Sequence, residues 1–430
     1  MSSYWLSPLS PDWRFEISPQ RIPSPPKEHE MTNWVADEQQ YLFQNYGRQP
    51  IVLERGEGTR VWDTEGHEYL DFVGGVAVNI LGHAHPVVAK AVAEQAQTLI
   101  HASNLFYTKP MIQLAKLLVE NSCLDRVFFC NSGTEAVEGA IKLARRWGLD
   151  TRNGAHEIIT TIDGFHGRSL GALAATGNAR YREPFGPLMP GFHHVPWNDL
   201  AQIKAATNEK TAAIMVEPIQ GEGGVNMPAP GYLQGIRDWC NEKGILLIFD
   251  EVQTGIGRTG SLFAYEQEGV EPDIMTLAKG LAGGVAIGAF MARESIAAHL
   301  VKGDHGSTFG GNALAAAAGY ATVKHVIDED LSGRCRAASD RLMARLRSME
   351  DRFDVVTEVR GRGLLIAVAF SRDCATDVMD ACRRKGLLVN NVRPNAIRLM
   401  PPLNVTDDEL DRACDILEEA ITASTAAVTK

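Results

Sequence analysis

The sequence predicts an α/β protein, with a large domain built on a mostly parallel sheet and a smaller α+β domain after it. Short apolar runs recur through the middle of the chain, and helical stretches such as EAVEGAIKLARRWG lie between them. Strands that alternate with helices indicate a parallel sheet covered on both faces. After about residue 320 the pattern changes to a long helix followed by strand-like segments. The predicted buried strands are RVFFC (126–130), EIITTI (157–162), AAIMVE (212–217), ILLIFD (245–250), DIMTL (273–277) and GAFMA (288–292).

The first 30 residues lack the apolar pattern that would place side chains in a hydrophobic core. Residues 1–30 hold six of the 20 prolines and show no apolar period, which indicates a disordered or non-essential N-terminal extension. We expect Met31, which opens MTNWVADEQQYLF, to be the true start. Residues 31–74 are expected to pack with the small domain, with short strands and turns between Ile51 and Phe72.

The large domain is expected over residues 75–319 and the small domain over residues 320–430. A helix is predicted over 85–102, because apolar residues recur there at helical spacing and a proline stands in its first turn. In the small domain, a helix near 337–349 precedes the strand-like VVTEVRGRGLLIAVAF, LLVNNV and AIRLMPP. Thr406 and Glu409 form a capping box before the apolar stripe of a closing helix.

Composition excludes several classes of protein. The 430 residues carry 42 basic and 53 acidic side chains, a net charge of −11, and no long basic run, which argues against nucleic-acid binding. No stretch approaches the roughly 20 apolar residues that span a bilayer, so no membrane association is expected. The seven cysteines are odd in number and include no CxxC pair. They predict free thiols in a reducing, cytoplasmic setting.

Three short motifs have simpler explanations than the chemistry they suggest. GIGRTG (255–260) matches a dinucleotide fingerprint, but DEVQT separates it from the preceding strand and no apolar helix follows. GRSLG (167–171) matches a hydrolase elbow, but DGFH separates it from its strand. His83 and His85 in GHAHP lack an identifiable third ligand, so no metal site is predicted. A dehydrogenase, a hydrolase and a non-enzymatic scaffold remain as remote alternatives.

Asp250 and Lys279 stand at the carboxyl ends of predicted strands. Ligands bind at that edge of open α/β sheets, so the Asp250 carboxylate could face a ligand cation; a helix cap or a structural ion pair is the alternative. Lys279 follows DIMTLA and opens the glycine-rich KGLAGG. A lysine desolvated there has a lowered pKa and becomes a Schiff-base nucleophile, although most lysines are surface residues.

An anion site is indicated by CNSGTEAVEGAIKLAR, where a strand ends and a helix begins. Bare amides around Ser132, Gly133 and Thr134 would bind a phosphate, with a plain N-cap as the alternative. The segment GFHGRS adds Phe165, a flat aromatic ring with an arginine close to it in the sequence. A phosphate cradle, an acid for a ring nitrogen and a Schiff-base lysine are together what pyridoxal phosphate needs.

Six segments resemble, in order, the signature segments of the class III pyridoxal-phosphate-dependent aminotransferases. The resemblance runs from about Arg48 to the C-terminal helix and implies a fold-type-I transferase. It implies that Lys279 binds the cofactor and later moves a proton, and that Asp250 pairs with its pyridine nitrogen. The segments are NSGTEAVEGAIKLAR, FHGRSLGALAATG, EPIQGEGG, LLIFDEVQTGIGRTG, TLAKGLAGG and HGSTFGGN.

The same resemblance assigns the remaining cofactor contacts. Gln253 would lie beside the phenolic oxygen, Phe165 would stack on the ring, and the segment 132–134 would hold the phosphate. Thr308 would reach the phosphate of the neighbouring subunit's cofactor, so the active unit would be a homodimer.

Two arginines and one glutamate are implied to select the substrates. Arg168 would hold the α-carboxylate of N-acetylornithine, Arg398 would hold that of 2-oxoglutarate, and Glu222 would pair with Arg398 while the distal-amine donor is bound. Arg393, five residues before Arg398, stands where other members often have glycine and is the alternative keto-acid arginine.

The implied reaction transfers the δ-amino group of N-acetylornithine reversibly to 2-oxoglutarate, in arginine biosynthesis. Alternative donors are ornithine, 4-aminobutyrate, succinyldiaminopimelate and a carrier-bound lysine, of which the net charge of −11 disfavours the last, since that carrier is acidic. Use of the same cofactor without transamination, in a decarboxylase or mutase, is a further alternative.

Overall fold

The computed structural model describes residues 33–426. Contacts divide the chain into two compact units, Met1–Val52 and Leu53–Lys430. The first unit contains helix α1 (Trp34–Tyr41), at whose start the Asn33 side chain accepts a hydrogen bond from Ala36 N. The expectations for residues 1–30 and for a start at Met31 concern residues outside the described range.

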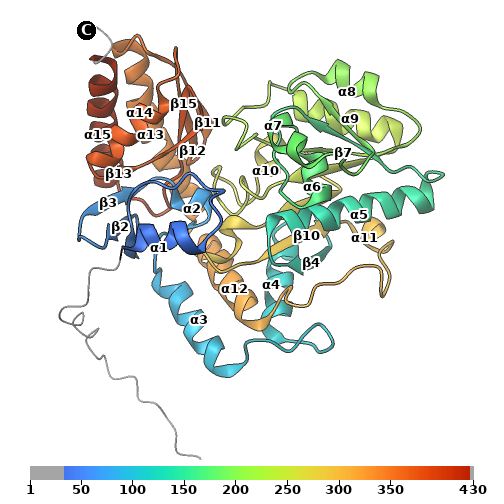
Figure 1. Cartoon of the computed structure of the whole chain (residues 1–430). Coiled ribbons are helices and arrows are strands. Elements are labelled where there is room, and N and C mark those ends of the chain that lie inside the picture. The colour runs from blue at the N-terminus through green and yellow to red at the C-terminus, as the bar shows by residue number, and fades with distance from the viewer. Residues whose placement is uncertain (1–32, 427–430) are drawn as a thin grey trace, which may run out of the picture. The chain divides into compact units, whose positions relative to one another are not determined.

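The central sheet of the second unit has seven strands in the order β4-β10-β9-β8-β7-β5-β6 (Figure 1). Neighbours from β6 to β9 are parallel, whereas β10 runs antiparallel to both β9 and β4. The prediction of a mostly parallel sheet is confirmed, and all six predicted runs are strands. The strands are β4 (Arg126–Cys130), β5 (Glu157–Thr161), β6 (Phe192–Val195), β7 (Thr211–Val216), β8 (Leu246–Asp250), β9 (Ile274–Leu277) and β10 (Gly288–Ala292).

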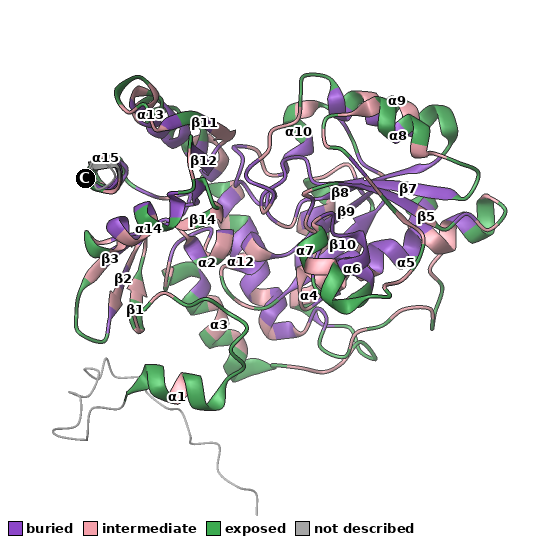
Figure 2. Ribbon diagram, turned by 45° about the horizontal axis from the view of Figure 1, so that its top comes forward, coloured by how far each residue is buried: buried purple, intermediate pink, exposed green. Residues whose placement is uncertain are grey.

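Both faces of this sheet are buried (Figure 2). Successive residues of β7 alternate between two apolar clusters: Ala213 and Met215 pack with α5 (Gly133–Thr151), while Ile214 and Val216 pack with α9 (Tyr232–Lys243). This double burial explains why the strands appear in the sequence as continuous apolar runs. Strand β6 was not predicted, because its sequence FHHV contains two histidines and lies at the sheet edge.

Further helices precede, follow and connect these strands. Helix α3 ends at Thr98 rather than at the predicted residue 102, because Leu99 is extended; Leu99 and Ile100 are exposed instead of continuing the apolar stripe. The remaining helical segments of this part are α2 (Gly74–Ala77), α3 (Pro86–Thr98), α4 (Lys109–Glu120), α6 (Leu170–Ala175), α7 (Ala179–Arg182), η1 (Glu183–Phe185), α8 (Leu200–Ala206), α10 (Tyr265–Glu268), η2 (Lys279–Ala282), α11 (Glu294–Ala297) and α12 (Ala313–Asp328).

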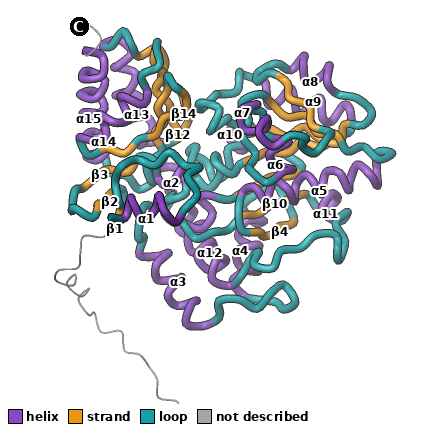
Figure 3. The backbone as a smooth tube through the Cα atoms, viewed as in Figure 1, coloured by secondary structure: helices purple, strands orange, loops and turns teal. Residues whose placement is uncertain are grey.

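The C-terminal part contains a four-stranded antiparallel sheet in the order β11-β12-β15-β14, with helices packed beside it (Figure 3). The predicted helix near 337–349 is the centre of the longer α13, and the predicted capping box is present, with Glu409 N donating to Thr406 Oγ1 and Thr406 N to Glu409 Oε2. The elements are α13 (Leu331–Arg352), β11 (Val356–Arg362), β12 (Leu365–Phe370), α14 (Ala375–Arg384), β14 (Asn390–Arg393), β15 (Ala396–Leu399) and α15 (Asp407–Ala426).

A third sheet joins the early strands of the second unit to the C-terminal part. It has the order β1-β2-β3-β13, formed by β1 (Leu53–Glu57), β2 (Arg60–Asp63), β3 (Glu68–Asp71) and β13 (Leu387–Leu388). Strand β13 pairs in parallel with β3. The boundaries expected at residues 74 and 319 stay predictions. Among the described helices, none combines the length and apolar character needed to cross a membrane.

Candidate active site

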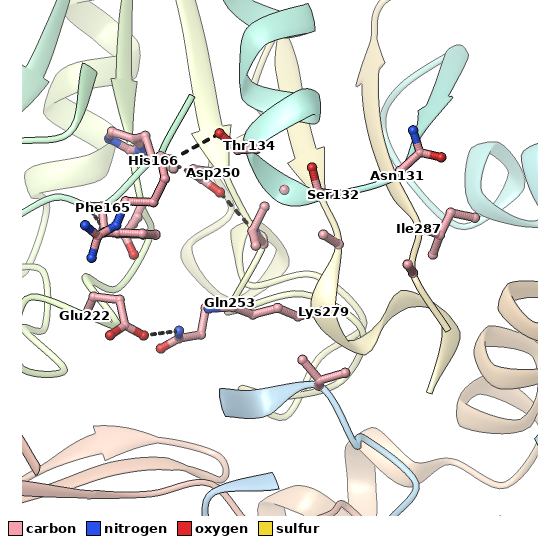
Figure 4. A pocket seen from close by; sticks show the side chains of 18 of the residues that line it. Asn131, Ser132, Thr134, Phe165, His166, Glu222, Asp250, Gln253, Lys279 and Ile287 are labelled. Carbon is pink, nitrogen blue, oxygen red and sulfur yellow. Dashed lines mark hydrogen bonds and ion pairs between the residues drawn. The ribbon is translucent and has the colours of Figure 1, made fainter. Parts of the chain in front are cut away.

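A cavity of about 460 Å³ lies at the carboxyl ends of the central strands (Figure 4). Nine of the predicted site residues line it, whereas Arg398 lies behind its wall and Thr308 lines a different, small cavity. The nine residues are Ser132, Gly133, Thr134, Phe165, Arg168, Glu222, Asp250, Gln253 and Lys279. The loops that follow five separate strands therefore bring most of the predicted site together.

Lys279 extends into this cavity from the turn that follows β9. Its backbone has a φ of 40°, a left-handed value that is uncommon for a residue other than glycine, so local strain fixes where the side chain starts. Burial lowers the pKa of Lys279 below its ordinary value, although the negative charge of Glu222 acts in the opposite direction. A lowered pKa increases the fraction of neutral amine, the form that acts as nucleophile or base.

Asp250, at the end of β8, is held on both carboxylate oxygens. Oδ1 accepts hydrogen bonds from Val252 N at 3.1 Å and Thr276 Oγ1 at 3.0 Å, and Oδ2 lies 2.8 Å from His166 Nδ1. Burial acts to lower the pKa of His166, but its hydrogen bond to Asp250 and the Asp250 charge raise it above the ordinary value. The buried His166 ring therefore fixes the position and orientation of the Asp250 carboxylate.

Helix α5 begins at the predicted anion site. The Ser132 side chain caps it by accepting from Glu135 N at 3.3 Å, and the first-turn amides of Gly133 and Thr134 have no acceptor within the helix. A Cβ at Gly133 would lie 2.9 Å from Val252 Cγ1, so glycine keeps this approach open. The Thr134 hydroxyl instead binds the turn at 168–169, accepting from Arg168 N at 3.1 Å and Ser169 N at 3.0 Å.

Phe165 and Arg168 form the opposite wall with a partner the sequence analysis missed. The Arg168 guanidinium lies 4.0 Å from the ring centre of Tyr181 and 5.6 Å from that of Phe165. Tyr181 meets Phe165 edge to face at 6.0 Å. Among the described residues no carboxylate pairs with Arg168, so its charge is available to an anionic ligand.

Glu222, Gln253 and Arg398 form a hydrogen-bonded cluster on the third side. Arg398 is 1% exposed, and its Nη1 lies 2.8 Å from Glu222 Oε1 and 2.9 Å from Gln253 Oε1. Gln253 Nε2 also donates to Glu222 Oε1 at 2.9 Å. Burial alone would raise the pKa of Glu222, but the Arg398 charge outweighs it and holds the pKa at about 2. Glu222 is therefore ionised and neutralises Arg398.

Glu217 is another buried residue that sequence reasoning missed. Its carboxyl group accepts hydrogen bonds from Phe165 N at 2.9 Å and from Gly221 N at 3.0 Å. Burial raises its pKa to about 7. Like His166, it lies inside one of the six quoted segments, but its contact with Phe165 spans 52 positions, so no spacing pattern could have identified its role.

The two histidines of GHAHP have separate partners. His83 Nε2 lies 2.7 Å from Asp71 Oδ2, and the rings of His85 and His325 lie 4.8 Å apart. Within residues 33–426 no three His, Cys, Asp or Glu side chains are grouped so as to hold a metal ion.

The site fits the three chemical demands of pyridoxal phosphate. The open amides of α5 suit its phosphate, the Asp250 carboxylate suits a protonated ring nitrogen, and the Lys279 amine suits its aldehyde. Phe165 lines the same cavity and offers a flat apolar surface. These groups come from different strands, yet they all face one space of about 460 Å³.

Comparison with known proteins gives one consistent family. The family model described as aminotransferase class-III matches residues 41–421. An acetylornithine aminotransferase of Caldanaerobacter subterraneus is 48% identical over 90% of this chain and 98% of its own, and one of Methanopyrus kandleri is 50% identical over 89% and 97%.

Solved structures agree with that result. The ornithine aminotransferase of Toxoplasma gondii superposes with a TM-score of 0.90 at 36% identity, covering 93% of this chain and 97% of its own. The N-acetylornithine aminotransferase of Stenotrophomonas maltophilia gives 0.80 at 37%, covering 91% and 100%. With this fold, this site and a family match over most of its length, the chain belongs to the class III aminotransferases.

Proposed function

We propose that this aminotransferase moves the δ-amino group of N-acetylornithine to 2-oxoglutarate, reversibly, in arginine biosynthesis. The observation that carries the proposal is the position of two cationic groups around one buried lysine. Arg168 has no carboxylate partner in the described chain, whereas Arg398 is already neutralised by Glu222 at 2.8 Å. Arg168 can therefore bind a substrate carboxylate at any time, whereas Arg398 can do so only after Glu222 has moved away from it. The relatives that carry the name acetylornithine aminotransferase support this donor.

Pyridoxal phosphate is the proposed cofactor, and a further structure of the ornithine aminotransferase from Toxoplasma gondii is described with partial occupancy of PLP at its active site. In this chain Ser132, Gly133 and Thr134 would hold the phosphate, and Gln253 would lie by the phenolic oxygen. When bound, the cofactor supplies a carbonyl that accepts the amine and a ring that withdraws electrons from the substrate carbon.

Proton transfer is assigned to this chain's own residues. The Lys279 amine, with its pKa lowered by burial, would take the proton from the substrate carbon that bears the amino group and would deliver it to the carbon that was the cofactor's aldehyde. Asp250, with His166 against its Oδ2 at 2.8 Å, would keep a proton on the cofactor's ring nitrogen. Phe165, which lines the cavity, would stack on the cofactor's ring and exclude water from one side.

Substrate selection follows from carboxylate pairing. The α-carboxylate of the amine donor binds Arg168, which leaves the distal amine near Lys279, while Glu222 stays on Arg398. For 2-oxoglutarate, Glu222 leaves Arg398, which then binds the α-carboxylate in two hydrogen bonds. Arg393 is less suited to this role, because its carboxylate partner is Asp163 at 2.7 Å, whereas Glu222, the residue proposed to move, pairs with Arg398 at 2.8 Å.

Ornithine is the second candidate donor. It is favoured by the TM-score of 0.90 to an ornithine aminotransferase, against 0.80 to an N-acetylornithine aminotransferase. The two donors differ only at the α-amino group, which is charged in ornithine and acylated in N-acetylornithine.

A panel of donors with 2-oxoglutarate tests the proposal. We expect glutamate to form in a one-to-one ratio with the donor consumed. N-acetylornithine should have a higher kcat/KM than ornithine, 4-aminobutyrate or succinyldiaminopimelate. The purified protein should bind pyridoxal phosphate with a visible absorption band, and Lys279→Ala should abolish both that band and turnover. Arg384→Ala, on the exposed side of α14, should leave both unchanged. A protein that pyridoxal phosphate fails to tint, or a donor consumed without glutamate, would overturn it.

We further propose a homodimer in which Thr308 completes the partner's phosphate site. Thr308 lies exposed outside the main cavity, and Asn104 donates to Ser307 O and Gly310 O on either side of it. Large side chains that follow Asn104 and Thr308 in the sequence are exposed to solvent. Their exposed fractions are 86% for Leu105, 67% for Phe106, 95% for Tyr107 and 60% for Phe309. Such apolar exposure supports burial against a second copy.

A cytoplasmic location is the proposal that the cysteines support. All seven are free thiols in the structure, and burial raises the pKa of several of them, Cys130 and Cys240 to about 12. Free, protonated cysteines are typical of a reducing compartment.

A further inference from the structure

The segment Gly221–Gly224, here called the Glu222 loop, is built as the tip of a hairpin. At its base Gln220 and Asn226 pair in an isolated antiparallel bridge, and the Gln220 side chain donates to Ile162 O at 2.8 Å. Glu217 accepts from Gly221 N at 3.0 Å. The base is therefore fixed to the central sheet, while the tip, which carries Glu222, extends beyond it.

The C-terminal sheet presents three arginines on the face that meets this tip. Arg360 of β11 and Arg398 of β15 are both paired with Ala367 of β12, so all three point to one face, with the smallest side chain in the middle. Arg393 of β14 is paired with Ala396, two residues before Arg398, and an irregularity after Asn391 turns it to the same face. We call Arg360, Arg393 and Arg398 the arginine face.

Each arginine of this face binds a different carbonyl of the Glu222 loop. Arg398 Nη1 donates to Gly221 O at 3.0 Å and Arg393 Nε to Gly223 O at 2.8 Å. Arg360 donates to Gly224 O twice, from Nε at 3.0 Å and Nη2 at 2.7 Å. Below the loop, Ile219 and Val225 pack with Leu365 and Ala367 of β12 and with Met400, which follows β15. Figure 4 shows the faint red strands of this sheet on the side of the cavity where Glu222 lies.

Arg393 also reaches a second wall of the cavity. Its Nη2 forms an ion pair with Asp163 Oδ1 at 2.7 Å, in the left-handed turn that leads to Phe165. A Cβ at Gly223 would lie 2.7 Å from Asp163 O, so the loop and the turn touch directly. One guanidinium thus joins the loop of Glu222 to the turn of Phe165.

We propose that Arg393 and Arg360 are positioning residues that hold the Glu222 loop against the C-terminal sheet and so favour the Glu222–Arg398 pair. Arg398 is the proposed substrate-binding member of the arginine face. Within residues 33–426, the other two guanidinium groups bind the loop backbone and neighbouring carboxylates. This inference rests on the proposed function, in which Glu222 stays on Arg398 for the amine donor and leaves it for the dicarboxylic partner.

Loosening the loop would change the two half-reactions in opposite directions. Glu222 would leave Arg398 more often. The α-carboxylate of glutamate or 2-oxoglutarate could then bind Arg398 with a smaller free-energy cost for separating the Glu222–Arg398 pair. The distal-amine donor would meet an uncompensated cation and bind less well. A residue that merely stabilised the fold would lower both half-reactions together.

The test measures the two half-reactions separately on the holoenzyme, as kcat/KM for N-acetylornithine and for glutamate. For Arg393→Ala and for Arg360→Ala we expect the ratio of the two values to fall about fivefold, the factor that corresponds to the net contribution of one hydrogen bond. Arg393→Lys, which keeps the charge near Asp163 but loses the Nε contact, should behave like Arg393→Ala. Arg384→Ala is the matched control. In a Glu222→Gln background, Arg393→Ala should change the ratio by less than about twofold, because it acts through Glu222.

Amide hydrogen exchange supplies a readout that does not depend on turnover. Peptides covering residues 219–226 should exchange faster in Arg393→Ala than in the wild type or in Arg384→Ala, while peptides from β7 stay unchanged. Unchanged exchange and an unchanged ratio, or a parallel loss in both half-reactions, would overturn the positioning role. If no donor transfers its amine to 2-oxoglutarate, the proposed function fails, and the exchange result still decides whether the arginines hold the loop.

Discussion

At the scale of single residues, Glu217 is a buried carboxyl group that holds two loops of the site and that should make the stability of the protein depend on pH. Its carboxyl group has a folded-state pKa raised to about 7 by burial, and its two backbone donors belong to the loops of Phe165 and Glu222. A carboxyl whose pKa is higher in the folded than in the unfolded state stabilises the fold at low pH. That stabilisation is lost as the pH rises from the unfolded value of about 4.5 through the folded value.

We therefore expect Glu217→Gln, which does not titrate, to alter the pH profile of stability. The free energy of unfolding of the wild type should decrease relative to that of Glu217→Gln between about pH 5 and pH 7.5. Urea unfolding of both proteins across this range measures the difference. A Glu271→Gln variant, changed on the exposed surface, controls for the loss of one carboxylate. A difference between wild type and Glu217→Gln that stays constant with pH would contradict the buried titration.

At the scale of elements, the start of α5 has both a structural and a binding role. Ser132 caps the helix through Glu135 N, and the neighbouring amides face the cavity. Removing the cap with Ser132→Ala should destabilise the protein by about 1 kcal/mol, since a first-turn donor loses its partner. It should also weaken binding of pyridoxal phosphate, because the first turn is less well ordered.

Urea unfolding of the cofactor-free protein and a titration with pyridoxal phosphate measure these two effects. Asp199→Ala is the matched control, because it removes the N-cap of α8, where the side chain accepts from Gln202 N at 3.0 Å, outside the main cavity. Equal losses of cofactor affinity in the two variants would contradict a role for the α5 start in phosphate binding.

At the scale of the whole molecule, the exposed apolar side chains around 105–107 test the proposed dimer. Phe106 is 67% and Tyr107 95% exposed in the single chain. The double change Phe106→Glu and Tyr107→Glu would place two charges in an apolar interface, so it should convert the dimer into monomers in analytical ultracentrifugation. Because Thr308 of the partner is lost with it, the affinity for pyridoxal phosphate should fall as well.

The exposed Leu149 on α5 provides a control for this experiment. Its side chain is 61% exposed and belongs to a different part of the chain, so Leu149→Glu should leave the association state unchanged. A wild type that sediments as a monomer at micromolar concentration, or a double variant that stays dimeric, would contradict the proposed interface.

Local sequence patterns were enough to predict the fold class, most strands of the central sheet and part of the candidate site. Residue patterns predicted the α/β class, the six main strands and six of the nine residues that line one cavity, because doubly buried strands are continuous apolar runs and ligand groups follow the ends of such strands. The other three, Arg168, Glu222 and Gln253, were assigned by the resemblance to the family. The end of α3 and the edge strand β6 were decided by local geometry that apolar spacing does not encode. Only the tertiary structure placed His166 on Asp250, Glu217 beneath two loops, and Arg360 and Arg393 on the Glu222 loop. All of those contacts except the one between Glu217 and Gly221 join residues tens to more than a hundred positions apart. A buried hydrogen bond depends on distance and direction in space, which no spacing along the chain records.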